Sequence, residues 1–217
     1  MKKLLLFTAV VLFAFTTAQS QELRIGFKAG VNFASIGGDF TDDYDGRTSF
    51  HIGGLVEIPI SEKFAVQPEL LYSSQGATSE YSDSFGGVTF TVEEKLKLDY
   101  INIPIMAKYY IIDGLAVEAG PQFGILVSAK GEYEASGGGD SESDEEDLKD
   151  VYNTLDIGFG LGGSYRLNNG VFFSARYVIG LSDVTNEDDF EGDFGPFDIE
   201  AFKQRNSVIQ LSAGFSF

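Results

Sequence analysis

Nine charged residues recur at alternate positions of otherwise apolar stretches, and these side chains have the best prospect of acting together. They are Arg24, Lys28, Glu57, Glu69, Lys108, Glu118, Asp156, Arg166 and Arg176. Charges of opposite sign that are removed from water must pair or stay hydrated. The mixture of cations and carboxylates therefore predicts a polar network that neutralises itself. We expect Lys108 and Glu118 to form its central ion pair. Arg176, Glu69 and Glu57 are expected to support that pair.

His51 is the only histidine of the chain, so metal sites built from two or three imidazoles are excluded. A hydrolase using His51 would need a serine or aspartate beside it, and the sequence has no G-x-S-x-G nucleophile motif. An isolated histidine is more often a structural residue with satisfied hydrogen bonds. We therefore expect no catalytic residue, no cofactor and no metal site.

Acidic residues dominate the segments between the apolar stretches. Of the 33 acidic residues, 25 lie in the intervals 35–47, 77–95, 130–153 and 183–203. The formal charge of -18 argues against nucleic acid as a partner, because that binding depends on neutralising phosphates. Oxygen ligands for Ca²⁺ are plentiful at 140–150 and 187–193, but neither run contains a D-x-D-x-D-G loop with a distal glutamate. Both runs are expected to be solvated, flexible loops.

The nine charged residues belong to stretches that alternate apolar and polar residues with a period of two, which is typical of β-strands. Eight such stretches are predicted, at 23–34, 48–60, 64–75, 101–111, 117–127, 154–167, 171–182 and 206–217. Proline cannot donate a hydrogen bond to a neighbouring strand. Bulges or strand ends are therefore expected at Pro68, Pro104 and Pro121.

The fourth and fifth stretches form the clearest hairpin. A three-residue loop at 112–114, whose glycine adopts the left-handed conformation, pairs Tyr109 with Val117 and Lys108 with Glu118. Both faces then stay in register, with apolar residues on one side and charged residues on the other.

The first 18 residues have the order of a secretory signal peptide: two lysines, an apolar run from 4 to 15, then small residues. The run is too short for a convincing membrane helix. Cleavage is expected between 18 and 21, which leaves a single domain at 19–217. Because the chain has no cysteine, neither a disulfide nor a lipoprotein anchor is expected.

The connections between the eight stretches alternate long and short, which is typical of barrels in bacterial outer membranes. Closure of the barrel pairs every strand edge, as a lipid environment requires. The predicted fold is therefore all-β: an eight-stranded antiparallel up-and-down transmembrane β-barrel with both termini periplasmic. A soluble lipocalin-like barrel would reverse the two faces. The glycine-rich, charged face fits a narrow interior better than the bulky apolar face does.

Several segments resemble the PorT-like outer-membrane β-barrel family of Bacteroidetes, over nearly all of the chain after the signal peptide. These segments are FKAGVNFA, HIGGLVEIPISEKFAVQPELLYSSQG, LDYINIPIMAKYY, LAVEAGPQFGILVSAK, ARYVIGLSDV and VIQLSAGFSF. The resemblance implies an eight-stranded outer-membrane barrel. The named member of that family is linked to protein secretion and gliding machinery, a role that these structural motifs do not carry over by themselves.

The sequence thus favours a small outer-membrane barrel with a structural or interaction role and outward acidic loops. The alternatives are a narrow channel, a secretion- or transport-associated barrel and an enzyme that uses His51. Expected partners are outer-membrane lipid and the barrel assembly machinery, because Phe215 and Phe217 resemble the C-terminal signal that this machinery recognises.

Overall fold

The computed structural model describes residues 23–38, 41, 44–86, 88–137, 140–186 and 203–217. The predicted signal peptide, its cleavage site and the acidic run at 187–193 lie outside the described residues. The elements are β1 (Arg24–Gly38), β2 (Asp45–Pro59), β3 (Phe64–Phe85), β4 (Val88–Ile112), β5 (Leu115–Gly137), β6 (Asp140–Asp147), the 3-10 helix η1 (Lys149–Val151), β7 (Leu155–Arg166), β8 (Val171–Gly180) and β9 (Gln204–Ser216). Within these ranges, no helix is long and apolar enough to cross a membrane.

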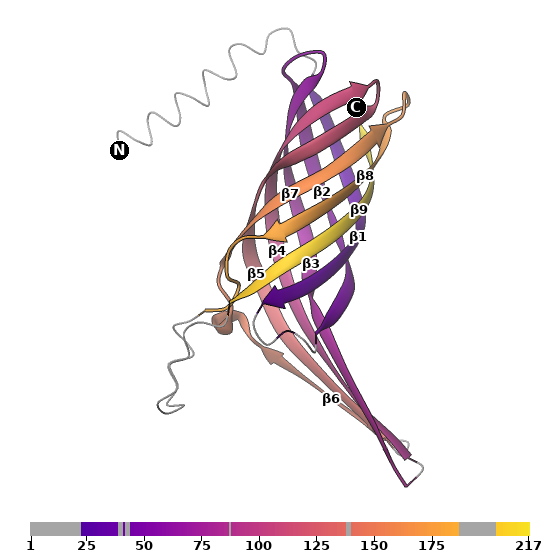
Figure 1. Ribbon diagram of the computed structural model, residues 1–217, viewed down its shortest axis with the longest axis vertical. Coiled ribbons are helices and arrows are strands. Elements are labelled where there is room, and N and C mark those ends of the chain that lie inside the picture. Colours follow the sequence, from indigo (N-terminus) through magenta and orange to yellow (C-terminus); the bar gives the residue numbers. More distant parts are fainter. Residues whose placement is uncertain (1–22, 39–40, 42–43, 87, 138–139, 187–202) are drawn as a thin grey trace, which may run out of the picture.

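Eight of the strands form a closed antiparallel ring (Figure 1). Strands β1 to β5 pair in chain order, β5 then pairs with β7, and β7 to β9 continue the ring. The ring closes where β1 pairs with β9, from Gly26 opposite Ser216 to Gly38 opposite Gln204. The predicted eight-stranded up-and-down barrel is confirmed. The remaining strand, β6, pairs with the distal part of β5 beyond the ring.

The barrel is apolar outside and polar inside. Large exposed side chains on its exterior include Ile25, Phe27, Phe50, Ile52, Leu70, Ile105, Phe123, Leu161, Phe173 and Leu211. On β1, Phe27 is 55% exposed while the adjacent Lys28 is 2% exposed, because successive side chains of a strand point to opposite faces. A soluble barrel has the reverse arrangement, so the lipocalin-like alternative is wrong.

The β4–β5 hairpin has the predicted register, with Lys108 opposite Glu118. Its turn differs from the prediction. Ile112 pairs with Leu115, so the loop is two residues long rather than three. A shift of register between Tyr110 and Ile112 absorbs the extra residue as a bulge. The register survives because the bulge replaces the longer loop.

Two intervals predicted as acidic loops are largely β-structure. Strand β3 continues to Phe85, β4 begins at Val88, and β5 runs to Gly137 before β6 pairs back along it. These parts of β3, β4 and β5 pair in that order and, with β6 at the edge, form a four-stranded sheet. It extends beyond the barrel (Figure 1) and is here called the sheet extension. The composition of these intervals predicted loops because both faces of this sheet carry polar residues. Backbone hydrogen bonding between strands, however, does not require an apolar face.

The three strand prolines are not at bulges or strand ends, contrary to the prediction. Pro68, Pro104 and Pro121 lie inside β3, β4 and β5. The shifts of register lie instead at 46–51 of β2 and at 99–100 and 110–112 of β4. In the pairing of β4 with β5, Pro104 lies opposite Gln122, and the next paired residues are Ala107 and Ala119. The proline, which has no N–H to donate, therefore lies beside a gap in the hydrogen-bonded ladder.

Gly114 and Gly86 provide a matched test of the short turn. Both have positive φ, of 80° and 64°, where a residue with a Cβ loses about 1–2 kcal/mol. A Cβ at Gly114 would also lie 2.3 Å from the carbonyl oxygen of Arg166, whereas a Cβ at Gly86 meets nothing within 4 Å. We expect Gly114→Ala to lower the free energy of unfolding, measured by urea titration in lipid vesicles, clearly more than Gly86→Ala does. Equal losses of unfolding free energy would contradict the close approach of the turn at Gly114 to the carbonyl oxygen of Arg166.

Candidate functional site in the barrel lumen

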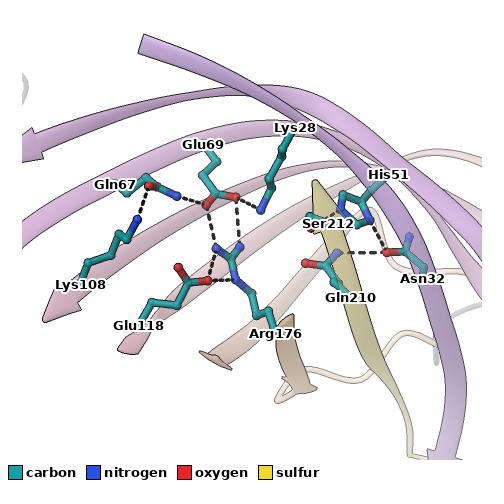
Figure 2. A network of polar contacts seen from close by, with 10 residues as sticks. All are labelled: Lys28, Asn32, His51, Gln67, Glu69, Lys108, Glu118, Arg176, Gln210 and Ser212. Carbon is teal, nitrogen blue, oxygen red and sulfur yellow. Dashed lines mark hydrogen bonds and ion pairs between the residues drawn. The ribbon is translucent and has the colours of Figure 1, made fainter. Parts of the chain in front are cut away.

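The centre of the lumen holds a buried ion cluster around Arg176 of β8 (Figure 2). Its Nη2 and Nη1 donate to Glu69 Oε1 and Oε2 at 2.7 and 3.0 Å, and its Nε and Nη2 donate to Glu118 Oε1 at 2.9 and 2.7 Å. Lys28 Nζ lies 2.7 Å from Glu69 Oε2, and Gln67 Nε2 donates to Glu69 Oε1 at 2.7 Å. The fork of one arginine thus joins strands from opposite sides of the barrel.

A second cluster around Glu57 lies nearer the short turns. Arg24 Nη1 donates to Glu57 Oε1 at 2.6 Å, while Lys108 Nζ and the Tyr110 hydroxyl donate to Oε2 at 2.9 and 2.6 Å. Lys108 Nζ also donates to Gln67 Oε1 at 3.1 Å. Gln67 therefore connects the two clusters into one continuous network.

The predicted ion pair between Lys108 and Glu118 is wrong, because each residue pairs with a different partner. The two residues lie opposite each other on adjacent strands and both face the lumen. Lys108 nevertheless pairs with Glu57, and Glu118 pairs with Arg176. Strand register brings side chains to the same level, but the contacts across a narrow lumen decide which charges meet.

The buried charges of this network balance. Its buried cations are Lys28, Lys108 and Arg176, and its buried carboxylates are Glu57, Glu69 and Glu118. Removing an ion from water is costly unless an opposite charge with good geometry compensates it. Equal numbers of cations and carboxylates therefore allow the lumen to be filled by charged side chains.

Strand β7 provides the room for the arginine. A Cβ added to Gly160 would lie 3.3 Å from Arg176 Cδ and 3.3 Å from Met106 Cε. Any larger residue at this position would press on the arginine side chain. The glycine at position 160 thus leaves the space that the Arg176 side chain occupies.

His51 belongs to a separate hydrogen-bonded group next to the ion cluster (Figure 2). Its Nδ1 lies 2.8 Å from Asn32 Oδ1 and its Nε2 lies 2.8 Å from Ser212 Oγ. Asn32 Nδ2 donates to the Ser74 carbonyl at 2.7 Å and to Ser73 Oγ at 3.0 Å, which fixes the orientation of its amide. Nδ1 of His51 is therefore the donor, and Nε2 accepts from the Ser212 hydroxyl.

This order of serine, histidine and amide is also the order found in nucleophilic triads. Here, however, His51 has no exposed surface. Both ring nitrogens are engaged by neighbouring side chains, and the ion cluster fills the lumen beside them. The arrangement thus supports a structural role for His51 rather than access of a substrate.

Asp156 lies farther toward the sheet extension, apart from the ion cluster. It accepts hydrogen bonds from Ser182 Oγ at 2.8 Å and from Asn206 Nδ2 at 3.3 Å. Asn206 Nδ2 also donates to the Tyr100 hydroxyl at 3.2 Å. This predicted residue therefore lies in the lumen but has neutral hydrogen-bond donors rather than a lysine or arginine.

An apolar cluster closes the lumen beyond Asp156. Its buried members are Ile36, Ala77, Leu98, Tyr100, Leu126 and Ala129. Leu148 and Tyr152, which flank η1, pack against this cluster from the segment between β6 and β7. Burial raises the pKa of Tyr152 to about 12, so its phenol is neutral at physiological pH. The segment after β6 therefore caps this end of the barrel.

Arg166 lies at the opposite end, where the short turns gather. It is half-buried and lines an open vestibule of about 930 Å³ together with Glu62 and Asp113. It also borders a void of about 10 Å³ beside Glu57 and Lys108, which is about the space of one water molecule. Arg166 is therefore a residue of the mouth, and the passage inward from it is nearly filled.

Sequence reasoning overlooked the uncharged members of the network. Asn32, Gln67, Tyr110, Gln210 and Ser212 all face the lumen, and Gln210 Nε2 donates to Asn32 Oδ1 at 3.3 Å. The strand alternation already placed these five on the polar face. The predicted network omits them because it includes only residues with a formal charge. Among the described residues, no three His, Cys, Asp or Glu side chains are arranged to hold a metal ion.

Phe215 and Phe217 lie at the end of the chain where β9 meets β1. The Phe215 ring stacks on Phe27 with centroids 6.4 Å apart, and Phe217 meets Phe215 edge-on at 5.0 Å. Phe217 is 77% exposed. The aromatic rings thus form a small exterior group beside the closing seam of the barrel.

A closed barrel with an apolar exterior and an electrostatically balanced interior defines the class of outer-membrane β-barrel proteins. Residues 17–186 match the model of the outer membrane protein beta-barrel domain, and the chain belongs to that family. Family membership gives the location of the protein as the outer membrane and makes lipid the surroundings of its apolar exterior.

Three solved structures illustrate what the chain is similar to. Ail of Yersinia pestis, in complex with the heparin analogue sucrose octasulfate, shares 13% identity over 90% of this chain and 99% of its own, with a TM-score of 0.46. Neisserial surface protein A shares 10% over 89% and 97%, with a TM-score of 0.42. A major outer membrane protein of Thermus thermophilus shares 15% over 90% and 100%, also with a TM-score of 0.42. No curated protein matches the chain.

Glu69→Gln tests the buried charge balance. The change keeps the shape but leaves Lys28 and Arg176 with one carboxylate fewer. Breaking a buried pair from one side costs about 3–5 kcal/mol, and we expect a loss of this order in urea unfolding in lipid vesicles. Glu62→Gln in an exposed turn is the control and should change stability by less than about 0.5 kcal/mol. Similar small effects for both variants would contradict the network.

A double-mutant cycle tests the partner of Lys108. Lys108→Met combined with Glu57→Gln should show a coupling of about 1–3 kcal/mol in the free energy of unfolding, because these side chains are in contact. Lys108→Met combined with Glu118→Gln should show a clearly smaller coupling. The reverse ranking would restore the pair expected from register alone.

Proposed function

We propose that the protein is a non-conducting outer-membrane barrel that holds the sheet extension outside the cell as an interaction surface. No catalysis is part of this proposal. The observation that carries it is the filled lumen, in which the balanced ion network, the His51 group and the apolar cluster follow one another along the barrel. A barrel sealed in this way offers function only at its ends.

The proposed orientation has both termini and the short turns in the periplasm and the sheet extension outward. Its support is the strong asymmetry of the two ends, since outer-membrane barrels have short periplasmic turns and longer outer loops. In this proposal residues 1–18 are a signal peptide removed between 18 and 21. Strand β9, with Phe215 and Phe217, would be the segment that the barrel assembly machinery recognises.

The finer family assignment is also a proposal. The segments quoted above support a place among the PorT-like barrels of Bacteroidetes. A secretion- or transport-associated role would follow only if the barrel passed ions or polypeptide. The tightly packed interior favours the interaction role over that alternative.

Conductance in planar lipid bilayers tests the proposal. The wild-type barrel should give no ion-carrying events, whereas Glu69→Ala combined with Arg176→Ala should give small channels. That pair of changes removes one cation and one carboxylate, so the remaining buried charges stay balanced while volume is freed. Glu62→Ala is the control and should stay closed. Heat-modifiable gel migration would verify that each barrel is folded.

Regular channel events from the folded wild-type protein would overturn the proposal in favour of the narrow channel. Closed behaviour of the double variant would show that the ion cluster is not the seal.

A further inference from the structure

The sheet extension has two faces of different origin. Strand alternation continues from the barrel, so one face is continuous with the lumen and the other with the barrel exterior. Leu98 and Ala129, both fully buried, mark the start of the lumen-side face. From there the cross-strand rows are Ala77–Leu96–Gly131–Glu146, Ser79–Glu94–Tyr133–Asp144 and Tyr81–Val92–Ala135–Glu142. The residues between these rows belong to the exterior-side face.

The exterior-side face neutralises about half of its own charge. Its carboxylates are Glu80, Glu93, Glu132, Glu134, Glu145 and Asp147, and three of these six form ion pairs with lysines. Lys95 pairs with Glu93 at 3.0 Å, Lys130 pairs with Glu145 at 2.5 Å, and Lys97 donates to Glu132. The hydrogen bond from Lys97 holds the pKa of Glu132 below its ordinary value. All three lysines of the sheet extension lie on this face.

The lumen-side face has no such compensation. Its carboxylates with described side chains are Asp83, Glu94, Glu142, Asp144 and Glu146, all exposed. None of these five forms a salt bridge with a lysine or arginine of the described chain. Five uncompensated carboxylates on one sheet face repel one another and attract cations.

Exposed aromatic rings lie among these carboxylates. Tyr81 is 67% exposed, Phe90 51% and Tyr133 42%. Phe90 is on the same face, because a Cβ on its partner Gly137 would strike its ring. An aromatic face attracts a lysine ammonium or an arginine guanidinium, and a neighbouring carboxylate supplies the charge-assisted hydrogen bond. The combination is suited to cationic side chains rather than to anions or sugars alone.

The same face is hollowed and has a free strand edge. A groove of about 250 Å³ lies at its base, lined by Tyr44, Glu94, Tyr133, Asp144 and Tyr152 among others. Strand β6 ends the sheet, so within the described chain its outer edge has no partner strand. An extended peptide can add to such an edge through its backbone while its side chains reach the face.

We propose that the lumen-side face of the sheet extension binds an extended polypeptide segment rich in lysine and arginine. This proposal rests on the interaction role and on the outward orientation proposed above. Alternate side chains of the bound segment lie over the aromatic rings and between the carboxylates. Lysines compensate half of the carboxylates on the exterior-side face and none of those on the lumen-side face, so the lumen-side face is the docking surface.

The test uses the full-length barrel in nanodiscs of zwitterionic lipid, which does not itself attract cations. The probe is a fluorescent ten-residue peptide of alternating lysine and serine, and the matched peptide has glutamine in place of lysine. Fluorescence anisotropy measures the affinity of each. We expect binding of the lysine peptide that weakens as NaCl screens the charges, and no binding of the glutamine peptide.

Two charge-matched variants separate the faces. The lumen-side variant carries Glu94→Gln, Glu142→Gln, Asp144→Asn and Glu146→Gln, and should bind the lysine peptide about tenfold more weakly. The exterior-side variant carries Glu80→Gln, Glu93→Gln, Glu134→Gln and Glu145→Gln, and should bind within about twofold of the wild type. Tyr133→Ala should weaken binding about two- to fivefold through loss of the cation–ring contact.

Equal losses in the two charge variants would overturn the proposal, because binding would then follow net charge rather than this face. Absence of lysine-peptide binding by a folded, closed barrel would overturn the docking surface alone and leave the sealed barrel intact. Channel events from the wild-type barrel would overturn the proposed function whatever the peptide does.

Discussion

The pairing of β1 with β9 is the contact on which the rest of the structure depends. Only a closed ring satisfies every backbone donor and acceptor of the eight strands without water. Closure brings the first and last described strands together over the whole length from Gly26 to Gly38. Once the ring is closed, the lumen has a fixed and narrow width, and the side chains that face inward must fill it.

That narrow lumen explains why the protein is apolar outside and polar inside. Apolar side chains face lipid, so the polar and charged residues are the ones that pack, and they are stable only because they compensate one another. Arg176 is the central residue of this network, because its guanidinium donates hydrogen bonds to both Glu69 and Glu118. A lysine has one charged nitrogen and no planar fork, so it could not join two strands in the same way. Gly160 on the neighbouring strand β7 provides the space for the Arg176 side chain.

The sheet extension follows from different physics. Beyond the barrel both faces of the strands meet water, so no apolar pattern is required. Backbone hydrogen bonds keep the strands together, with the cross-strand ion pairs of Lys97 and Lys130. The two faces nevertheless differ, because lysines gather on one and leave the carboxylates of the other uncompensated. Leu148 and Tyr152 connect this region to the barrel by capping the lumen. The sheet extension and the apolar cluster that closes the lumen are therefore structurally connected.

The sequence alone determined the eight barrel strands, their register at Lys108 and Glu118, and the identity of the inward charges. It did so because strand alternation has a period of two and a one-residue slip would turn every side chain to the wrong face. It misread the outer parts of β3 to β6 as loops, since strands with water on both faces leave no hydrophobic signature. Which charges pair was decided only in three dimensions. Lys108 meets Glu57 rather than Glu118 because partners across a lumen depend on barrel width and on the reach of each side chain, and alternation along one strand records neither.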